Sequence, residues 1–351
     1  MDRYIGLDAH VQSCTLGVVG PSGKRLSKMV VETNGKALIS AVSSIPGHRH
    51  LCIEEGAQSA WLYEILRPHV EELVVTIAPK SRGDKDDERD AFARADDLRT
   101  GRLRGVYKAP KQFAGLRAAG RAYGMALQDT VRAKNRLKAV WLSRGITTDT
   151  GIYETEARKA WLKKVPPAQR QFAQWLGRTL DELTPLRDEA EAWLLKEAKS
   201  HPITRTLATS PGLGPIRTAQ LVAIVVTPHR FRTSRQFWSY CGLAIVTRSS
   251  SDWTKDRSGA WKRVERQRTL GLNRDRQPQL KAIFKGAATT VIGRMKDHPL
   301  HQHYQAMLDK GIRHNLAKLT IARQIAAATL SMWKHEEVYD PERQRSTSQP
   351  S

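Results

Sequence analysis

The first 80 residues alternate short apolar segments with amphipathic ones. Period-two apolar positions predict strands, and apolar positions three and four apart predict helices. We expect a buried strand over 4–10, a tight bend and a second strand over 11–19, then strands at 28–32, 50–54 and 73–78, with helices at 34–44 and 59–66. Strands that alternate with helices predict a mixed α/β sheet with helices packed on its faces.

Acidic side chains stand at unusual places in this pattern. Asp8 lies within an otherwise apolar first strand, where burying a carboxylate is costly unless a basic side chain or a metal ion pairs with it. Glu54 ends a later strand, and ligands of such sheets bind beyond the strand ends. Asp87 and Asp90 are three residues apart, so they project from one face near the start of a predicted helix. Taken singly, these acids also fit a plain salt bridge and an N-terminal acid cluster.

Beyond residue 110 the pattern becomes helical. Two long charged helical segments, 116–144 and 154–199, are interrupted by Gly145 and by Pro166-Pro167. They predict a helical, coiled-coil-like spacer or dimerisation region over 110–200, with a simple helical subdomain as the alternative. Residues 201–335 predict a basic, mainly helical C-terminal domain, and 336–351 a disordered polar tail.

Charge is distributed unevenly along the chain. Of 58 basic and 35 acidic side chains, residues 1–109 hold 16 and 15, so almost all of the net charge of +23 lies in the rest. A nearly neutral front and a strongly basic rear indicate a polyanionic partner, and nucleic acid is the first candidate. No apolar run is long enough to span a bilayer, and no secretory signal precedes the first strand, so we expect a cytoplasmic protein without a membrane partner. Three scattered cysteines are expected to be buried free thiols.

Two segments of the rear carry candidate contacts to nucleic acid. Residues 207–221 read as helix, tight glycine turn and helix, similar to the helix-hairpin-helix of DNA-binding proteins, and a purely structural turn is the alternative. A basic and aromatic stretch follows Pro228 and contains the serine run 249–251, which could also be a polar loop. The nucleic-acid-binding residues that we predict are Gly212, Gly214, Arg217, Arg248, Lys255, Arg257, Lys262 and Arg263.

Four acids gathered at strand ends and a helix start suggest a metal site. Converging carboxylates repel one another, and a hard divalent ion such as Mg²⁺ relieves that repulsion through oxygen ligands. Two such ions can activate a nucleophile and stabilise a leaving oxygen in phosphodiester chemistry. The predicted metal ligands are Asp8, Glu54, Asp87 and Asp90.

The order and spacing of these motifs resemble a known family. Residues 6–10, 53–56 and 85–91 are similar to the DEDD, RuvC-like domain of one class of bacterial insertion-sequence transposases. Residues 211–214, and 231–244 with the following serines, resemble the C-terminal transposase domain of that class. The resemblance covers roughly residues 3–335.

This resemblance implies a site-specific recombinase that mobilises its own element. Residues 1–109 would form a ribonuclease-H-like (RuvC-like) domain that holds Mg²⁺, and 201–335 would supply a serine that becomes covalently linked to DNA. It also implies a structured guide RNA, the bridge RNA, that pairs with donor and target DNA, and a homo-oligomer (a dimer or tetramer).

Carried over residue by residue, the resemblance makes Asp8, Glu54, Asp87 and Asp90 the catalytic acids and Ser250 the nucleophile. The family often has Glu-Ala-Thr-Gly where this chain has Glu54-Glu55-Gly56, so Glu55 is a rival ligand. It often has Ser-Gly where this chain has Ser250-Ser251, so Ser249 and Ser251 stay open as nucleophiles.

Two other functions fit the same residues. A metal-dependent nuclease or Holliday-junction resolvase would use the four acids with water as the nucleophile. A non-catalytic nucleic-acid-binding protein would use the acids structurally.

Overall fold

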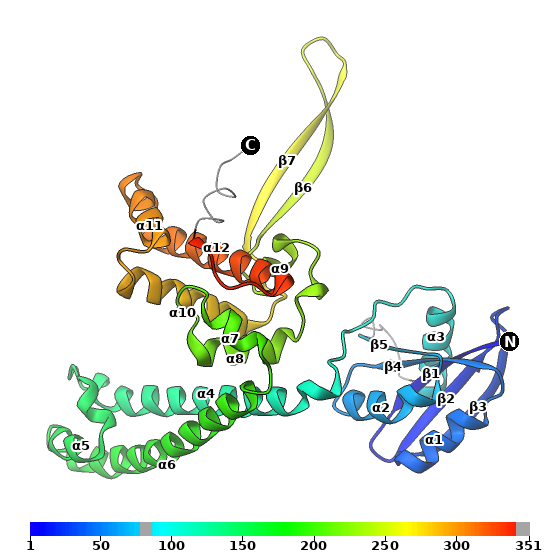
Figure 1. Ribbon diagram of the computed structural model, residues 1–351, viewed down its shortest axis with the longest axis horizontal. Coiled ribbons are helices and arrows are strands. Elements are labelled where there is room, and N and C mark those ends of the chain that lie inside the picture. Colours follow the sequence, from blue (N-terminus) through cyan, green and yellow to red (C-terminus); the bar gives the residue numbers. More distant parts are fainter. Residues whose placement is uncertain (78–85, 342–351) are drawn as a thin grey trace. The chain divides into compact units, whose positions relative to one another are not determined.

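The computed structural model describes residues 1–77 and 86–341, and at 248–252 and 264–268 it describes the backbone alone. The chain divides into two compact units, Met1–Pro110 and Lys111–Ser351. Each unit has a hydrophobic core of its own (Figure 1).

The N-terminal unit is built on a five-stranded mixed sheet in the order β3-β2-β1-β4-β5. β1 pairs antiparallel with β2 and parallel with β4, and β5 continues the parallel part. The strands are β1 (Asp2–Ala9), β2 (Ser13–Val19), β3 (Arg25–Glu32), β4 (His48–Glu54) and β5 (Glu72–Thr76). The predicted mixed sheet is thus confirmed, and its form is compatible with a ribonuclease-H-like fold.

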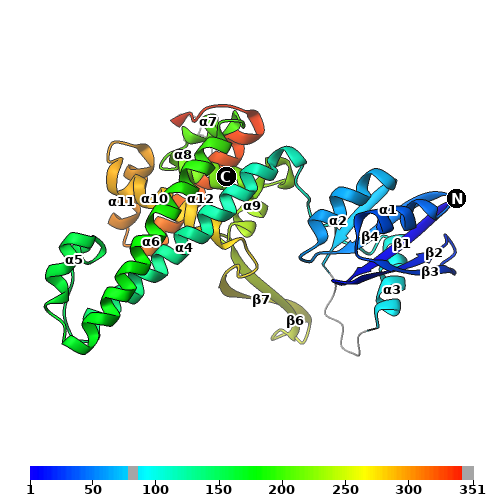
Figure 2. The ribbon, with the colours of Figure 1, turned by 90° about the horizontal axis from the view of Figure 1, so that it is seen from below.

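Helices cover both faces of this sheet, as Figure 2 shows. On one face, α1 (Gly35–Ser44) and α2 (Ser59–Leu66) bury Leu38, Val42 and Leu62 against the strands. Ile5 and Leu7 of β1 point into this core. Because side chains alternate along a strand, Gly6 and Asp8 face the other side, which is covered by α3 (Asp87–Arg99).

The C-terminal unit begins with a long helical hairpin. α4 (Ala114–Leu142) packs along α6 (Pro167–Ala198), and α5 (Thr155–Leu162) closes the far end. The core of this arm is formed where Leu137 and Trp141 meet Leu176 and Leu180. The predicted breaks hold: the chain leaves α4 just before Gly145, and α6 starts at the second proline of Pro166-Pro167.

A buried arginine ties α5 to α6. Arg158 is 4% exposed, and its guanidinium donates two hydrogen bonds to the carboxylate of Asp181, at 2.8 and 2.7 Å. It also donates to the backbone carbonyl of Ile152 at 2.8 Å. Gly177 leaves room for this side chain, because a Cβ there would lie 2.4 Å from a guanidinium nitrogen.

The remaining helices share with α12 (His314–His335) the largest hydrophobic core among the described residues. They are α7 (Ile203–Ala208), α8 (Gly214–Val225), α9 (Ser234–Tyr240), α10 (Pro278–Arg294) and α11 (Pro299–Asp309). Short 3-10 helices occur at Arg67–His69, Lys111–Phe113, Thr150–Tyr153 and Pro228–Arg230.

A long two-stranded hairpin was not expected from the sequence. β6 (Ile245–Lys255) and β7 (Trp261–Leu272) pair antiparallel and project from the helical body (Figure 1). The turn is closed by Asp256, whose carboxylate accepts hydrogen bonds from the backbone of Ser258 and Ala260 at 2.8 and 3.1 Å. The predicted mainly helical domain therefore needs a β-ribbon added, and the serine run lies in a strand, not in a polar loop.

The predicted disordered tail also needs a correction. Residues 336–341 are described, and Tyr339 stacks on His298 while its backbone N–H donates to Thr209. The rest of that tail, 342–351, lies outside the described residues.

The cysteine prediction is confirmed. Cys14, Cys52 and Cys241 are buried and unpaired, and burial raises the pKa of Cys52 to about 12. None of the described helices is long and apolar enough to cross a lipid bilayer.

The ion pair at the end of the arm gives a pH-dependent prediction. The Arg158 guanidinium holds the pKa of Asp181 below its ordinary value of 3.8. The stabilisation is therefore present above that pH and is lost as the pH falls through the lowered pKa. We expect Asp181→Asn to lower the Tm by about 2–4 °C at pH 7.

The difference between wild type and Asp181→Asn should narrow as the pH falls below 4, because unfolded wild-type chains then bind a proton at Asp181 that the folded protein binds only at the lowered pKa. Thermal scans by circular dichroism across this range measure it. A difference that is the same at pH 3 and pH 7 would show that the charge of Asp181 contributes nothing.

Candidate metal centre and nucleic-acid interface

A pair of glycines lets α3 lie directly on the sheet. Gly6 of β1 stands opposite Gly17 of β2. A Cβ at Gly6 would lie 1.9 Å from the carbonyl oxygen of Ala91 and 2.7 Å from the amide nitrogen of Ala95. A Cβ at Gly17 would lie 3.0 Å from Phe92. Side chains larger than hydrogen would push the helix outward, so these two positions set its height above the strands.

That close packing brings the first turns of α3 over Asp8. Asp8 is two residues after Gly6 on the same face of β1 and is 8% exposed. Asp86 caps α3, accepting hydrogen bonds from the backbone of Glu88 and Arg89. The helix then presents Asp87, Asp90 and Arg94 from one face, because these positions are three and four residues apart.

Arg94 joins two of the predicted ligands. Its guanidinium donates to Oδ1 of Asp8 at 3.0 Å and to the carboxylate of Glu54. The arginine side chain is only 11% exposed, as is that of Asp8. The carboxylates therefore sit around a fixed positive charge, which offsets the cost of burying Asp8.

His10 joins Asp8 to a third acid. Its Nε2 lies 3.2 Å from Oδ2 of Asp8 and 3.1 Å from Oδ1 of Asp87. One imidazole nitrogen carries at most one proton, so it can donate fully to only one of these carboxylates. One ligand atom from each of Asp8, His10 and Asp87 falls within 4.8 Å of the others, a spacing that could hold a metal ion.

The two adjacent glutamates occupy different surroundings. Glu54 contacts Arg94 on the Asp8 side of the sheet. Glu55 is held by Lys108 at 2.5 Å, and Lys108 also donates to Ser59 at 2.9 Å. Of the two, Glu54 is the one that shares a partner with Asp8, which favours it over Glu55 as a ligand.

The structure thus connects Asp8 with Glu54 and with Asp87. Among the described contacts, none joins Asp90 to the other three acids, although α3 carries it on the face of Asp87 and Arg94. Sequence reasoning missed two members of the cluster. Arg94 lies four residues after Asp90, so helical spacing places it on the same face of α3, whereas His10 follows the end of β1 and its contact with Asp87 depends on how α3 packs.

The donor set suits a hard divalent cation. Carboxylate oxygens dominate it, and Mg²⁺ and Mn²⁺ prefer oxygen ligands. Both internal partners of the acids, Arg94 and His10, are themselves groups that carry or can carry positive charge. The surroundings of the acids therefore favour a cation, and a divalent ion would take over part of the role that Arg94 has here.

The candidate nucleophile lies in the other unit. Ser250 belongs to β6, where its Cα pairs with that of Arg266 on β7. Ser249 pairs with Gln267, and Ser251 pairs with Glu265. The side chains of these serines and of Arg248 lie outside the described residues, so the choice of nucleophile rests on the sequence.

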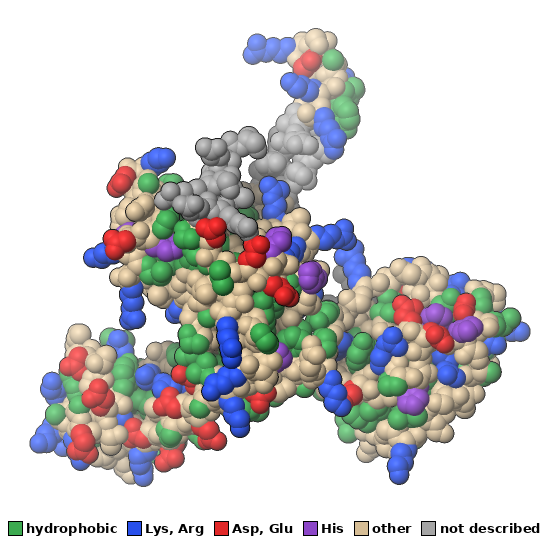
Figure 3. All heavy atoms as spheres, viewed as in Figure 1, with side chains coloured by type: hydrophobic (Ala, Val, Ile, Leu, Met, Phe, Trp, Pro, Cys, Tyr) green, Lys and Arg blue, Asp and Glu red, His purple; other side chains and the backbone are tan. Residues whose placement is uncertain are grey.

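Four predicted nucleic-acid contacts gather at the end of the β-ribbon. Lys255, Arg257, Lys262 and Arg263 surround its turn, where Figure 3 shows basic side chains clustered with apolar ones. Trp253 and Trp261 are 63% and 62% exposed there, and Lys255 lies over the ring of Trp261 at 5.2 Å. Exposed indole rings among basic side chains are typical of surfaces that stack bases and hold phosphates.

The two glycines in the turn of the predicted helix-hairpin-helix have different surroundings. Gly212 packs on α10, since a Cβ there would lie 2.4 Å from the carbonyl oxygen of Ala287. Arg217 braces the turn by donating to the carbonyl of Gly212 at 2.7 Å and to Thr290 at 3.1 Å. Gly214 faces open space and lines a cavity together with Arg217. Of the two glycines, Gly214 is the one whose surroundings leave room for a phosphate.

Comparison with known proteins identifies related sequences over both units. A transposase family model of the DEDD type matches residues 5–143. A second model, described as the transposase IS116/IS110/IS902 family, matches residues 204–305. The two matches include the acid cluster and the glycine turn with the β-ribbon, respectively.

Two relatives agree with these matches. A putative transposase, y4qE, from Sinorhizobium fredii is 23% identical over 268 residues, or 72% of this chain and 66% of its own length. An uncharacterized 44.8 kDa protein of insertion element IS116 from Streptomyces clavuligerus is 27% identical over 135 residues, which are 38% of this chain and 30% of its own. The matched parts thus span less than two thirds of either relative.

The glycine contact under α3 can be tested by adding one methyl group. Gly6→Ala should lower the free energy of unfolding of the N-terminal unit by about 1–3 kcal/mol, because α3 must move off the sheet. The matched control is Gly56→Ala, since no atom lies within 4 Å of a Cβ at Gly56. Urea unfolding measures both, and equal stability of the two variants would contradict the close contact.

Proposed function

The chain belongs to the IS116/IS110/IS902 family of transposases, and we propose that it is a DNA recombinase that moves an insertion sequence by cutting and rejoining DNA strands. The observation that carries this proposal is the convergence of Asp8, Glu54 and Asp87 on the shared partners Arg94 and His10, in a chain whose second unit presents a basic ribbon. Membership of a DEDD transposase family implies use of a divalent metal.

In this proposal Asp8, Glu54, Asp87 and Asp90 hold Mg²⁺. When bound, divalent ions stabilise the charge that develops on the attacking and leaving oxygens of a phosphodiester. Arg94 would hold Asp8 and Glu54 in place until the ion binds, and would then be released from one of them and could contact the phosphate. His10 would fix the orientation of Asp8 and Asp87.

Ser250 is the proposed nucleophile. Its Oγ would form a bond to the phosphorus of the scissile phosphate while the bond from that phosphorus to one sugar oxygen breaks. The serine gives up its proton and the departing sugar oxygen takes one up, so the step balances without an oxidant or reductant. The phosphoserine link conserves the energy of the broken bond, and reversal of the same step on another strand rejoins DNA.

Both nucleic-acid partners of the proposal are polyanions. The net charge of +23, held mainly outside the first unit, supports DNA binding and equally supports binding of a structured guide RNA. Exposed apolar side chains on the helical arm support self-association: Met125, Phe172 and Trp175 are 60%, 55% and 56% exposed.

A cleavage assay tests the proposed chemistry. The full chain would be incubated with Mg²⁺, DNA from the end of the element and the flanking transcript, and products run on denaturing gels before and after protease. We expect a protease-sensitive protein–DNA adduct that is lost, by at least about a hundredfold, in Asp8→Ala and Ser250→Ala.

Neighbouring variants sharpen this test. Glu54→Gln should abolish the adduct, whereas Glu55→Gln, which affects the Lys108 pair, should retain it. Ser249→Ala and Ser251→Ala should also retain it. Cleavage that survives Ser250→Ala without any adduct would overturn the serine mechanism and leave a metal-dependent nuclease.

A further inference from the structure

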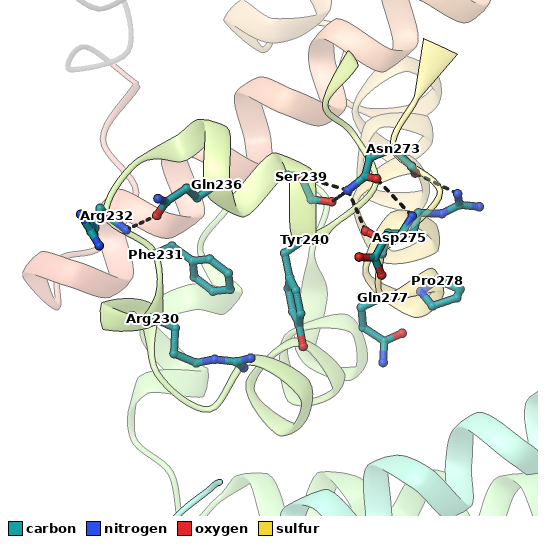
Figure 4. A pocket seen from close by; sticks show the side chains of 11 residues that line it. Arg230, Phe231, Arg232, Gln236, Ser239, Tyr240, Asn273, Asp275, Gln277 and Pro278 are labelled. Atoms are coloured by element: carbon teal, nitrogen blue, oxygen red, sulfur yellow. Dashed lines mark hydrogen bonds between the residues drawn. The ribbon is translucent and has the colours of Figure 1, made fainter. Parts of the chain in front are cut away.

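A cavity of about 780 Å³ opens at the foot of the β-ribbon, away from the acids and the serine run in sequence. It is lined from two segments, 230–240 and 273–278. Figure 4 shows Tyr240 projecting between two groups of side chains, with Phe231 and Arg230 on one side and Asp275 and Gln277 on the other. Its volume falls in the range of small-ligand pockets.

The aromatic part of this cavity is already arranged for stacking. The rings of Phe231 and Tyr240 are 5.3 Å apart, and Phe231 is largely buried. The Arg230 guanidinium lies 5.0 Å from the centre of the Tyr240 ring and is anchored by the carbonyl of Val225 at 3.0 Å. The planes of the two rings are tilted by 46°, so the Tyr240 ring alone, with Arg230 over it, would serve as the platform for a nucleobase.

Cations concentrate around the same cavity. Arg230, Arg232 and Arg276 line it, with Asp275 as the only carboxylate among its described lining residues. The Nε of Arg276 is buried and has no hydrogen-bond partner among the described residues. Burial, together with the charges of Arg276 and Lys285, lowers the pKa of nearby Lys281. A bound anion would reduce the repulsion among these positive charges. In a nucleotide, that anion is the phosphate joined to the base through its sugar.

Amide groups complete the lining and are held in place. Asn273 donates to the backbone carbonyl and the hydroxyl of Ser239 at 3.0 and 2.9 Å, and to the carbonyl of Asp275 at 2.6 Å. The backbone N–H of Gln277 donates to the carbonyl of Tyr240 at 2.9 Å. The two segments are thus tied together, and the side chains of Gln277 and Asp275 offer polar groups for the edge of a base.

We propose that this cavity binds a single unpaired nucleotide, with its base stacked on Tyr240 and its phosphate held by the surrounding arginines. The inference rests on the proposed function in one respect, that the ligand belongs to a nucleic acid. It adds a site that captures a base outside a duplex, in a DNA strand or in an RNA.

The test separates base stacking from charge. Fluorescence anisotropy would compare two 12-residue single strands of equal charge, one entirely abasic and one carrying a single 5-iodouracil among abasic residues, each made as DNA and as RNA. The full chain should bind the base-bearing strand about tenfold more tightly. Whichever backbone gives the larger ratio identifies the source of the nucleotide.

Variants and cross-linking assign that preference to the cavity. Tyr240→Phe should keep the tenfold ratio, and Tyr240→Ala should reduce it to about one while the abasic strand binds as before. Trp193→Ala, which removes a partly exposed ring on α6, should keep the ratio. Irradiation of the wild-type complex should cross-link the iodouracil to a peptide containing Phe231 or Tyr240, which requires no variant to fold.

Three results would overturn the proposal. Equal binding of the two strands by wild type, or a preference that survives Tyr240→Ala, would exclude stacking in this cavity while leaving nucleic-acid binding intact. Cross-links confined to other peptides would do the same. Failure of both strands to bind would contradict the proposed function itself.

Discussion

A carboxylate on a buried strand needs a positive charge beside it, and the N-terminal unit is built around that need at Asp8. Gly6 and Gly17 allow α3 to approach the sheet closely. That approach brings Arg94 to Asp8 and Glu54, and brings Asp87 to His10. With a bulkier residue at Gly6, the helix could not lie at this height, and the acids on it would no longer share partners with the strand. The packing of the fold and the geometry of the candidate site therefore depend on the same contact.

Much of this unit could be predicted from the sequence because its elements are regular. Apolar residues at every second position predicted the strands, and the acids within or at the end of these strands predicted Asp8 and Glu54 as metal ligands. The roles of Arg94 and His10 could not be predicted in the same way. Each meets its partner only when α3, which carries Arg94 86 residues after Asp8, lies over β1. Local spacing places a residue on a face, but the partner across the interface depends on tertiary packing.

The second unit shows a different reason for incomplete prediction. Its helices followed the apolar periodicity and the breaks at glycine and proline. The β-ribbon did not follow such a periodicity, because a ribbon with solvent on both sides has few apolar residues at every second position. Trp253 and Trp261 are exposed on it, so the alternation of buried apolar and exposed polar residues that predicts a strand is missing. The cavity around Tyr240 could not be predicted either, because its two lining segments, 230–240 and 273–278, are separated in the sequence by the β-ribbon.

We propose that the acids around Asp8 form a divalent-cation site, and anomalous diffraction from crystals of the full chain grown with Mn²⁺ tests this most directly. We predict an anomalous peak within coordination distance of Asp8 and of at least one of Glu54, Asp87 and Asp90, with the Arg94 guanidinium displaced from one of its present carboxylates. Crystals that hold Mn²⁺ elsewhere, with no peak at Asp8 and Arg94 still joining Asp8 to Glu54, would contradict the claim and make the cluster a structural ion-pair network.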